Sequence, residues 1–182
     1  MEVVVAVPSG ETMELLIPEL IRARQADPDL PAVRIRPGAP AGSLPDGLPA
    51  DLRRLLSLSN GIHLGVRATV LPAEELPFYE YAETLARAAG IPNVEDYLMI
   101  GTVNEAPLLL DTTDGSVWAA RAGSGLWYQG CTLVRLADGL DAFVSDWAAG
   151  PRFPELVESD DPDDLARDDW WRLLQAAGRV PA

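Results

Sequence analysis

The sequence predicts an α+β domain, and three observations carry that prediction. Short apolar segments separated by turn residues fill the second half of the chain, which is typical of antiparallel strands. Segments with helical periodicity stand before, between and after them. With 182 residues and 48% hydrophobic residues, the chain can build the core of a single domain without disulfides or metals.

The chain begins with a predicted strand and a predicted helix. Residues 2–7 are apolar and mostly β-branched, and Pro8-Ser9-Gly10 ends them, so we expect a buried strand. Leucine, isoleucine and alanine then recur at helical spacing over 11–25. Pro18 lies inside this segment, and it either kinks the helix or marks a later start near Ile17.

A loop rich in proline and glycine over 37–47 follows a short expected strand at 32–35. This loop is the best candidate for a boundary between an N-terminal extension and the main body. We therefore expect one globular domain in three parts: a strand-and-helix extension over 1–43, an α+β core over 44–153 and an acidic helical tail over 154–182.

The core opens with a predicted helix over 48–61. Pro49 stands in its first turn, where a missing N–H costs little, and leucines form an apolar stripe. Asn60-Gly61 ends the helix, because glycine readily takes the left-handed conformation. A strand, a turn of helix and a longer helix should follow at 66–71, 72–76 and 79–89.

The second half of the chain is richer in strands. Thr112-Thr113-Asp114-Gly115 indicates a tight turn that joins two of them in a hairpin. A helix with one apolar face is expected over 139–149. The expected strands are 97–100, 106–111, 116–120 and 132–136.

The tail combines negative charge with a helix. Eight of the fifteen residues from 155 to 169 are acidic. A final helix is expected over 164–177, with Asp163 or Asp164 as its N-cap, since carboxylates there suit the helix dipole.

Two adjacent tryptophans, Trp170 and Trp171, stand in this last helix. Neighbouring helical residues point about 100° apart, so both rings can hardly occupy the centre of one apolar face. We expect one ring to pack in the core and the other to lie near a rim or an interface, where tryptophan is enriched.

The charge balance narrows the classes of partner. The chain has 28 acidic and 14 basic residues, for a formal net charge of −14, so we expect neither nucleic acid nor a membrane as partner. A basic protein would be attracted and its encounter accelerated, although the same charge also suits an ordinary solvated surface. All 14 basic residues are arginine, which removes lysine chemistry such as a Schiff base.

The cysteine content and the N-terminus point to a compartment. Cys131 is the only cysteine, so no intramolecular disulfide can form, which favours reducing conditions. The apolar run at the N-terminus has no basic residues before it and is too short for a membrane span or a secretory signal. We therefore expect a cytoplasmic protein.

The sequence offers little for catalysis. His63 is the only histidine, and a catalytic pair with Cys131 would require the fold to join them; a surface histidine and a buried cysteine are the simpler interpretation. Asp160-Asp161-Pro162-Asp163-Asp164 lacks the glycine and the glutamate of a calcium-binding loop, so a solvated acidic loop is favoured. We expect no enzyme activity, no cofactor and no metal.

Candidate partner contacts follow from charge and from aromatic side chains. The acidic loop forms one surface, with a tryptophan of the tail as its anchor. Trp127 and Tyr128, with the loop after Gly61, form a second patch, and packing in the core is the alternative for these two rings. The candidate residues are Asp160, Asp161, Asp163, Asp164, Trp170, Trp171, Trp127 and Tyr128.

Four segments stand in a familiar order between residues 44 and 147. They are Leu48-Pro49-Ala50-Asp51-Leu52 to Ser59-Asn60-Gly61, Leu98-Met99-Ile100-Gly101, Leu108–Trp118 and Val134–Val144. Together they resemble the SUKH superfamily, which includes bacterial toxin-immunity proteins and yeast cell-wall synthesis regulators of the Smi/Knr type. Two positions depart from its pattern: Asp138-Gly139 replaces the usual serine before the last helix, and Thr102–Glu105 replaces a glycine-rich turn.

The resemblance implies a curved, mostly antiparallel sheet flanked by helices. It also implies an immunity protein that binds and inhibits a cognate toxin, often a nuclease or a deaminase. An acidic protein can plug the basic substrate channel of such a toxin. The alternatives are a regulatory scaffold of the Smi/Knr type with several partners, or an enzyme or small-ligand binder built around His63. We expect a monomer or a weak homodimer.

Overall fold

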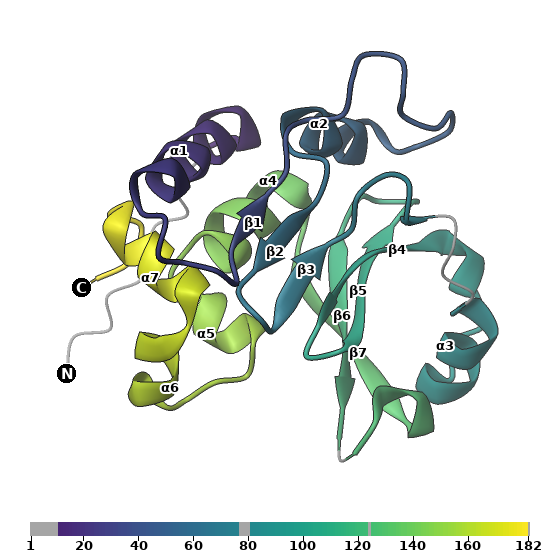
Figure 1. Cartoon of the computed structure of the whole chain (residues 1–182). Helices are drawn as coiled ribbons and strands as arrows, with labels where there is room; N and C mark the ends of the chain where they lie inside the picture. The colour runs from purple at the N-terminus through teal and green to yellow at the C-terminus, as the bar shows by residue number, and fades with distance from the viewer. Residues whose placement is uncertain (1–10, 77–80, 124, 182) are drawn as a thin grey trace.

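The computed structural model describes residues 11–76, 81–123 and 125–181 (Figure 1). In this described part, seven strands form one open antiparallel sheet and seven α-helices surround it, so the fold class is α+β. The strands follow one another across the sheet in chain order, from β1 at one edge to β7 at the other. The strand expected over 2–7 lies outside the described residues.

The strands become longer from β4 onward. Apolar residues dominate both faces of the central strands, which is why β5 is buried along almost all of its length. The strands are β1 (Arg34–Ile35), β2 (Ile62–Leu64), β3 (Ala68–Val70), β4 (Tyr97–Val103), β5 (Ala106–Asp111), β6 (Val117–Ala122) and β7 (Cys131–Ala137).

The helices cover both faces of the sheet. Figure 1 shows α3 on one side and α4 to α7 on the other. Among the described residues, the 3₁₀ helix η2 (Val94–Asp96) precedes β4, and η3 (Trp127–Gln129) stands between β6 and β7. The α-helices are α1 (Met13–Ala26), α2 (Ala50–Leu58), α3 (Ala82–Ala89), α4 (Leu140–Ala142), α5 (Phe153–Leu156), α6 (Pro162–Arg167) and α7 (Asp169–Ala176).

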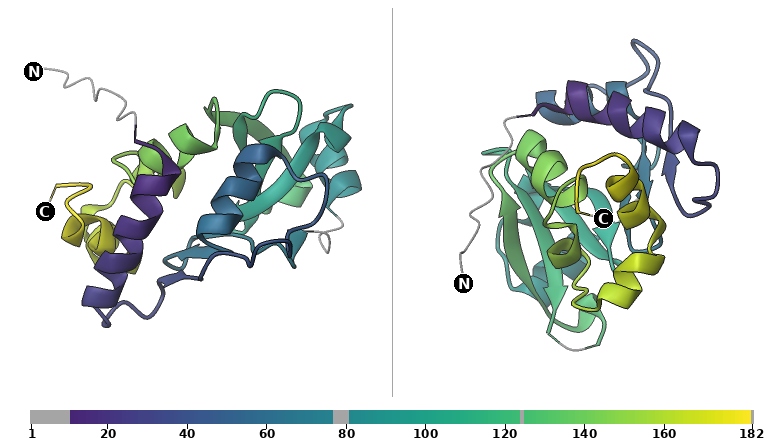
Figure 2. Two further views of the ribbon diagram at one scale, coloured as in Figure 1. Left: turned by 90° about the horizontal axis from the view of Figure 1, so that it is seen from above. Right: turned by 90° about the vertical axis from the view of Figure 1, so that its left-hand side faces the viewer.

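Helix α1 packs against α2 and α7, and Figure 2 shows it running along the outside of this helical layer. Its inner face is fully buried, which provides most of the attachment. Arg54 of α2 adds polar contacts, because its guanidinium lies 2.8 Å from Glu14 and 3.3 Å from Asp141. Pro18 lies well inside the helix, so the alternative of a later start near Ile17 is wrong.

Gly101 of β4 allows two strands to approach each other. A Cβ atom at this position would lie 2.1 Å from the carbonyl oxygen of Thr69 in β3. The register of β4 against β5 also shifts between Met99 and Gly101, which is a β-bulge. A side chain at this position would collide with β3, so the close approach of the two strands requires glycine.

Several predicted boundaries need correction. The helix predicted over 48–61 ends at Leu58, and Ser59 after it is extended. The residues after Gly61 form β2 instead of a loop, and no sequence signal predicted this strand or α5. The helix predicted over 139–149 is α-helical only over α4 and continues as a π-helix, η4 (Phe143–Ala148). The start predicted at Tyr79 lies outside the described residues.

The final helix, predicted as one segment over 164–177, is two helices that meet at Asp168. This residue is extended, and its carboxylate accepts hydrogen bonds from the N–H groups of Trp170 and Trp171 at 2.9 and 3.0 Å. Aspartate favours such a cap over a helix interior, which explains the break. Asp161, and not Asp163 or Asp164, caps the first of the two helices.

No helix in the described ranges is both long enough and apolar enough to cross a membrane.

Candidate partner-binding site

His63 and Cys131 lie in different parts of the sheet. His63 is exposed in β2, opposite Thr69, and Cys131 begins β7. Five strand spacings separate β2 from β7, which is roughly 24 Å. Burial raises the pKa of the Cys131 thiol, which keeps it protonated near neutral pH. The structure therefore offers no catalytic pair of these two residues.

The acidic loop uses part of its charge for local structure. Asp161 accepts a hydrogen bond from the N–H of Asp163 at 2.9 Å. Asp164 pairs with Arg67 of the β2–β3 turn and accepts a hydrogen bond from Ser159, and the guanidinium lowers the pKa of this carboxyl below its ordinary value. Asp160 and Asp163 are exposed. In the described part of the chain, no group of three or more metal-ligating side chains could hold a metal ion.

The two tail tryptophans have different environments. Trp170 is 1% exposed, and its indole N–H donates to the carbonyl oxygen of Ala148 at 2.6 Å. The candidate assignment of Trp170 as a partner contact is therefore corrected, because the ring belongs to the core. Trp171 is half-buried and stacks on Phe153 with ring centroids 6.3 Å apart. Trp171 therefore remains a candidate contact, as the half-buried member of the pair.

Trp127 and Tyr128, the other two aromatic candidates, form η3 between β6 and β7. Their rings pack edge to face, with centroids 6.0 Å apart and an angle of 82° between the planes. Tyr128 is 46% exposed and the preceding Leu126 is 43% exposed. Trp127 is half-buried and packs against the core, so the alternative of core packing holds in part for this ring. Tyr128 and Leu126 present an apolar and aromatic surface to solvent, which is typical of partner-binding surfaces.

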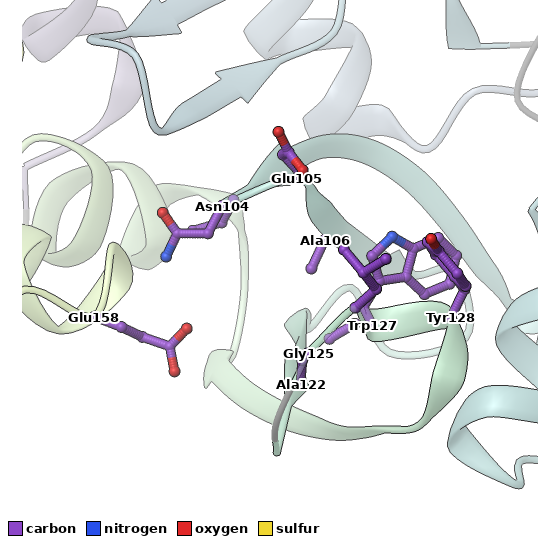
Figure 3. Close-up of a pocket in the computed structure, with 11 residues that line it drawn as sticks. Asn104, Glu105, Ala106, Ala122, Gly125, Trp127, Tyr128 and Glu158 are labelled. Carbon is purple, nitrogen blue, oxygen red and sulfur yellow. The ribbon is translucent and has the colours of Figure 1, made fainter.

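This surface is one wall of a pocket of about 340 Å³, shown in Figure 3. The opposite walls come from the turn between β4 and β5 and from Glu158, which follows α5. In Figure 3 the Glu158 carboxylate extends toward the pocket from the side opposite Trp127 and Tyr128. We call this site the aromatic–acidic pocket, and its lining residues are Val103, Asn104, Glu105, Ala106, Ala120, Ala122, Gly125, Leu126, Trp127, Tyr128 and Glu158.

Unusual backbone conformations concentrate at this pocket. In the described ranges, three residues other than glycine have a positive φ: Asn104 at 48°, Glu105 at 67° and Glu158 at 53°. All three line the pocket. Such conformations cost about 1–3 kcal/mol each and tend to occur at functional sites, where the surrounding structure holds them.

Hydrogen bonds hold these strained residues in place. Asn104 donates from its backbone N–H to the carbonyl oxygen of Arg67 at 2.7 Å, and from its side chain to that of Val157 at 2.9 Å. These bonds tie the β4–β5 turn to the β2–β3 turn and to the segment after α5. The turn that follows β2, after Gly61, thus contacts the β4–β5 turn through the carbonyl oxygen of Arg67.

The pocket carries two exposed carboxylates. Glu105 has no ion pair with any arginine in the described ranges, and it stands at the rim of the turn. Glu158 is paired through Oε2 with Arg121 at 3.0 Å, yet its side chain remains 53% exposed. Carboxylates beside exposed aromatic rings suit a cationic ligand, because ring faces and carboxylates both attract positive charge.

Sequence reasoning found the aromatic wall of the pocket and missed its acidic walls. Asn104 and Glu105 belong to the segment that departs from the superfamily's glycine-rich turn, and this departure was the available signal. Glu158 lies 53 residues from Glu105 along the chain, and it was only one of the eight acidic residues counted in the tail. No family model matches the chain, and a search of curated proteins found no relative.

Proposed function

We propose that this chain is a non-enzymatic protein-binding module, and specifically an immunity protein that neutralises a basic toxin acting on nucleic acid. The observation that carries the proposal is the aromatic–acidic pocket, where an exposed and a half-buried aromatic ring lie beside carboxylates on a chain of net charge −14. Long-range attraction would bring a basic partner to the surface quickly, and the apolar wall would hold it there. We expect no metal, cofactor or reaction at this site.

The exposed side chains around the pocket favour a protein over a small molecule. Tyr128 and Leu126 extend the apolar area beyond the pocket itself, which a partner surface can cover and a small ligand cannot. Tyrosine and tryptophan are also the residues that contribute most to binding energy at protein interfaces. Hydrogen bonds from Asn104 to the carbonyl oxygens of Arg67 and Val157 hold the backbone of the β4–β5 turn, which reduces the entropy lost on binding.

Membership of the SUKH superfamily is part of the same proposal. The four resembling segments fall on α2, on β4, on the β5–β6 hairpin and on the step from β7 into α4. The sequential antiparallel sheet flanked by helices agrees with the architecture that the resemblance implies. A cytoplasmic location and a monomeric or weakly dimeric state remain expectations of the sequence.

The test uses the purified full chain as bait in a lysate of the organism that encodes it. We expect one basic protein to be recovered at about 0.05 M salt and released at about 0.5 M, since the Debye length falls severalfold between them. Purified partner must then be toxic when expressed alone and harmless when expressed with this chain. A partner that binds without losing its activity would contradict the immunity role and favour the regulatory scaffold.

Two double variants with equal charge change decide which surface binds. Glu105→Gln with Glu158→Gln removes two carboxylates from the pocket, and Asp160→Asn with Asp163→Asn removes two exposed carboxylates from the acidic loop. We expect the pocket variant to weaken partner binding by at least about tenfold and the loop variant to slow association only slightly. The reverse ranking would move the site to the acidic loop.

A further inference from the structure

The molecule places a guanidinium between an indole ring and a carboxylate at two other places on its surface. Arg152 lies 3.6 Å from the centroid of the Trp147 ring, and its Nη2 is 2.7 Å from Glu155. Arg135 lies 5.9 Å from the centroid of the Trp118 ring, and its Nη2 is 3.0 Å from Asp138. In both places the ring face and the carboxylate bind the same cation.

The aromatic–acidic pocket contains the same two kinds of group. Trp127 and Tyr128 supply the aromatic faces, and Glu158 extends toward the pocket from the opposite side (Figure 3). No arginine in the described ranges lies over either of these rings. Arg121 lies 3.0 Å from Oε2 of Glu158, and a carboxylate has about four acceptor positions, so one arginine leaves acceptor capacity on this group.

We propose that the pocket binds an arginine side chain of the partner protein, with the guanidinium on the Trp127–Tyr128 pair and hydrogen-bonded to Glu158. Glu105 at the rim adds negative potential at the entrance. This inference rests on the proposed function, because the arginine is expected on the basic partner. A volume of about 340 Å³ is within the range of sites that enclose small organic groups.

Arginine fits this arrangement better than lysine does. The guanidinium is planar, stacks on aromatic rings and presents several N–H donors, whereas the ammonium group is a compact and strongly hydrated charge. Two carboxylates in the lining also disfavour any anionic ligand, such as a phosphate. The chemistry of the pocket therefore selects a guanidinium from among the common charged groups of proteins.

The test needs no knowledge of the partner. The full chain, labelled with ¹⁵N, is titrated with Nα-acetyl-arginine-N-methylamide, and the neutral citrulline analogue serves as a control of nearly the same shape. We expect saturable shifts of the Trp127 indole N–H and of the backbone amides of Asn104, Glu105 and Glu158, with a Kd on the order of 1–10 mM. The citrulline analogue should leave these signals almost unchanged, because it lacks the charge.

Charge variants distinguish the effect of the pocket carboxylate on probe binding from the effect of the protein's overall negative charge. Glu158→Gln should weaken binding of the arginine probe by about fivefold, the upper end for an exposed ion pair. Glu95→Gln removes the same charge from η2, near the opposite end of β4, and should change the Kd by less than about twofold. Trp127→Leu, judged folded by its amide spectrum, should abolish the local shifts.

Three outcomes overturn the guanidinium proposal: equal shifts with the citrulline analogue, equal weakening by Glu158→Gln and Glu95→Gln, or shifts centred on another acidic region. Each of these leaves the proposed function open, because the lysate experiment and the toxicity readout test it separately. Probe binding at the pocket together with no toxin partner would instead support the site and contradict the immunity role.

Discussion

Two acidic regions of this molecule use their carboxylates in different ways. In the acidic tail, Asp161 and Asp168 cap helices and Asp164 pairs with Arg67 and Ser159. At the aromatic–acidic pocket, Glu105 of the β4–β5 turn and Glu158, which the start of the tail contributes, have a positive φ and lie with Trp127 and Tyr128 in the lining. The first region has the higher density of charge along the sequence, and the second is the proposed binding site.

The comparison shows that a run of acidic residues does not by itself indicate a partner surface. A helix N-terminus needs acceptors for its free N–H groups, and aspartate supplies them. Three of the tail aspartates therefore have a structural reason to be where they are. At Glu105 the backbone conformation costs free energy, so folding alone gives no reason for a glutamate there.

The largest expected difference between the regions concerns their tryptophans. Trp170→Ala should lower the free energy of unfolding by about 3–5 kcal/mol, because it leaves a cavity in the core. Trp127→Ala should lower it by only about 1–2 kcal/mol, since the ring packs on the core with one part and lies in solvent with the other. Equilibrium unfolding in urea measures both values. Similar losses for the two variants would mean that Trp127 is a core residue and would remove the aromatic wall from the proposed site.

The caps provide the next largest effect. Asp168→Ala removes the acceptor for two helix N–H groups and should lower the free energy of unfolding by about 1–2 kcal/mol. Asp160→Ala, on an exposed neighbour with no hydrogen bond in the described structure, should change it by less than about 0.5 kcal/mol. Urea unfolding measures both values. A large loss of stability in Asp160→Ala would contradict the distinction between capping and solvated aspartates in the tail.

Much of the fold could be predicted because its signals are local. Strand β5 has the predicted bounds, since Ala106–Asp111 is a continuous apolar segment between two turns. Strand β4 was predicted to end at Ile100 but runs to Val103, because Thr102 and Val103 pair with β3. The pairing with β3 depends on residues more than thirty positions away, and the local pairing with β5 closes through Asn104-Glu105, a turn without the glycine that would mark a hairpin.

The site was less accessible from the sequence for the same reason. Trp170 packs in the core because its indole N–H donates to the carbonyl oxygen of Ala148, which belongs to a different helix. No pattern within α7 indicates this contact. The pocket joins the β4–β5 turn, η3 and Glu158, and only the fold brings these three segments together. Composition suggested a basic partner, and geometry then moved the candidate surface from the acidic loop to the pocket.

Two tail carboxyls should also respond to pH in opposite directions. Pairing with Arg67 lowers the pKa of Asp164, so its contribution to stability is present above the unfolded pKa of about 3.9 and is lost as the pH falls through the folded value. Burial raises the pKa of Asp168, so its contribution is fully present below about pH 3.9 and is lost as the pH rises through the folded value.

Asparagine variants isolate the two contributions. Relative to the unmodified chain, Asp164→Asn should gain stability as the pH falls below about 4, and Asp168→Asn should gain stability as the pH rises above about 4. Asparagine retains the ability to cap, so the second variant keeps its helix. Urea unfolding between about pH 3 and 7 measures both slopes. If the stability of both variants changed with pH in the same direction, the pKa shifts of the two carboxyls would not have opposite signs.

The smallest expected effect tests the strain at the pocket. Glu105→Gly should raise the free energy of unfolding by about 0.5–1 kcal/mol, because the turn has positive φ at both central residues and Asn-Gly is the favoured pair there. The same variant should weaken binding of the arginine probe, since it removes a carboxylate from the rim. Glu105→Gln is the matched control, because it removes the charge and keeps the strained backbone. A loss of stability in Glu105→Gly would mean that the glutamate stabilises the fold, whereas a gain with weaker binding means that the turn gives up stability to present a charge.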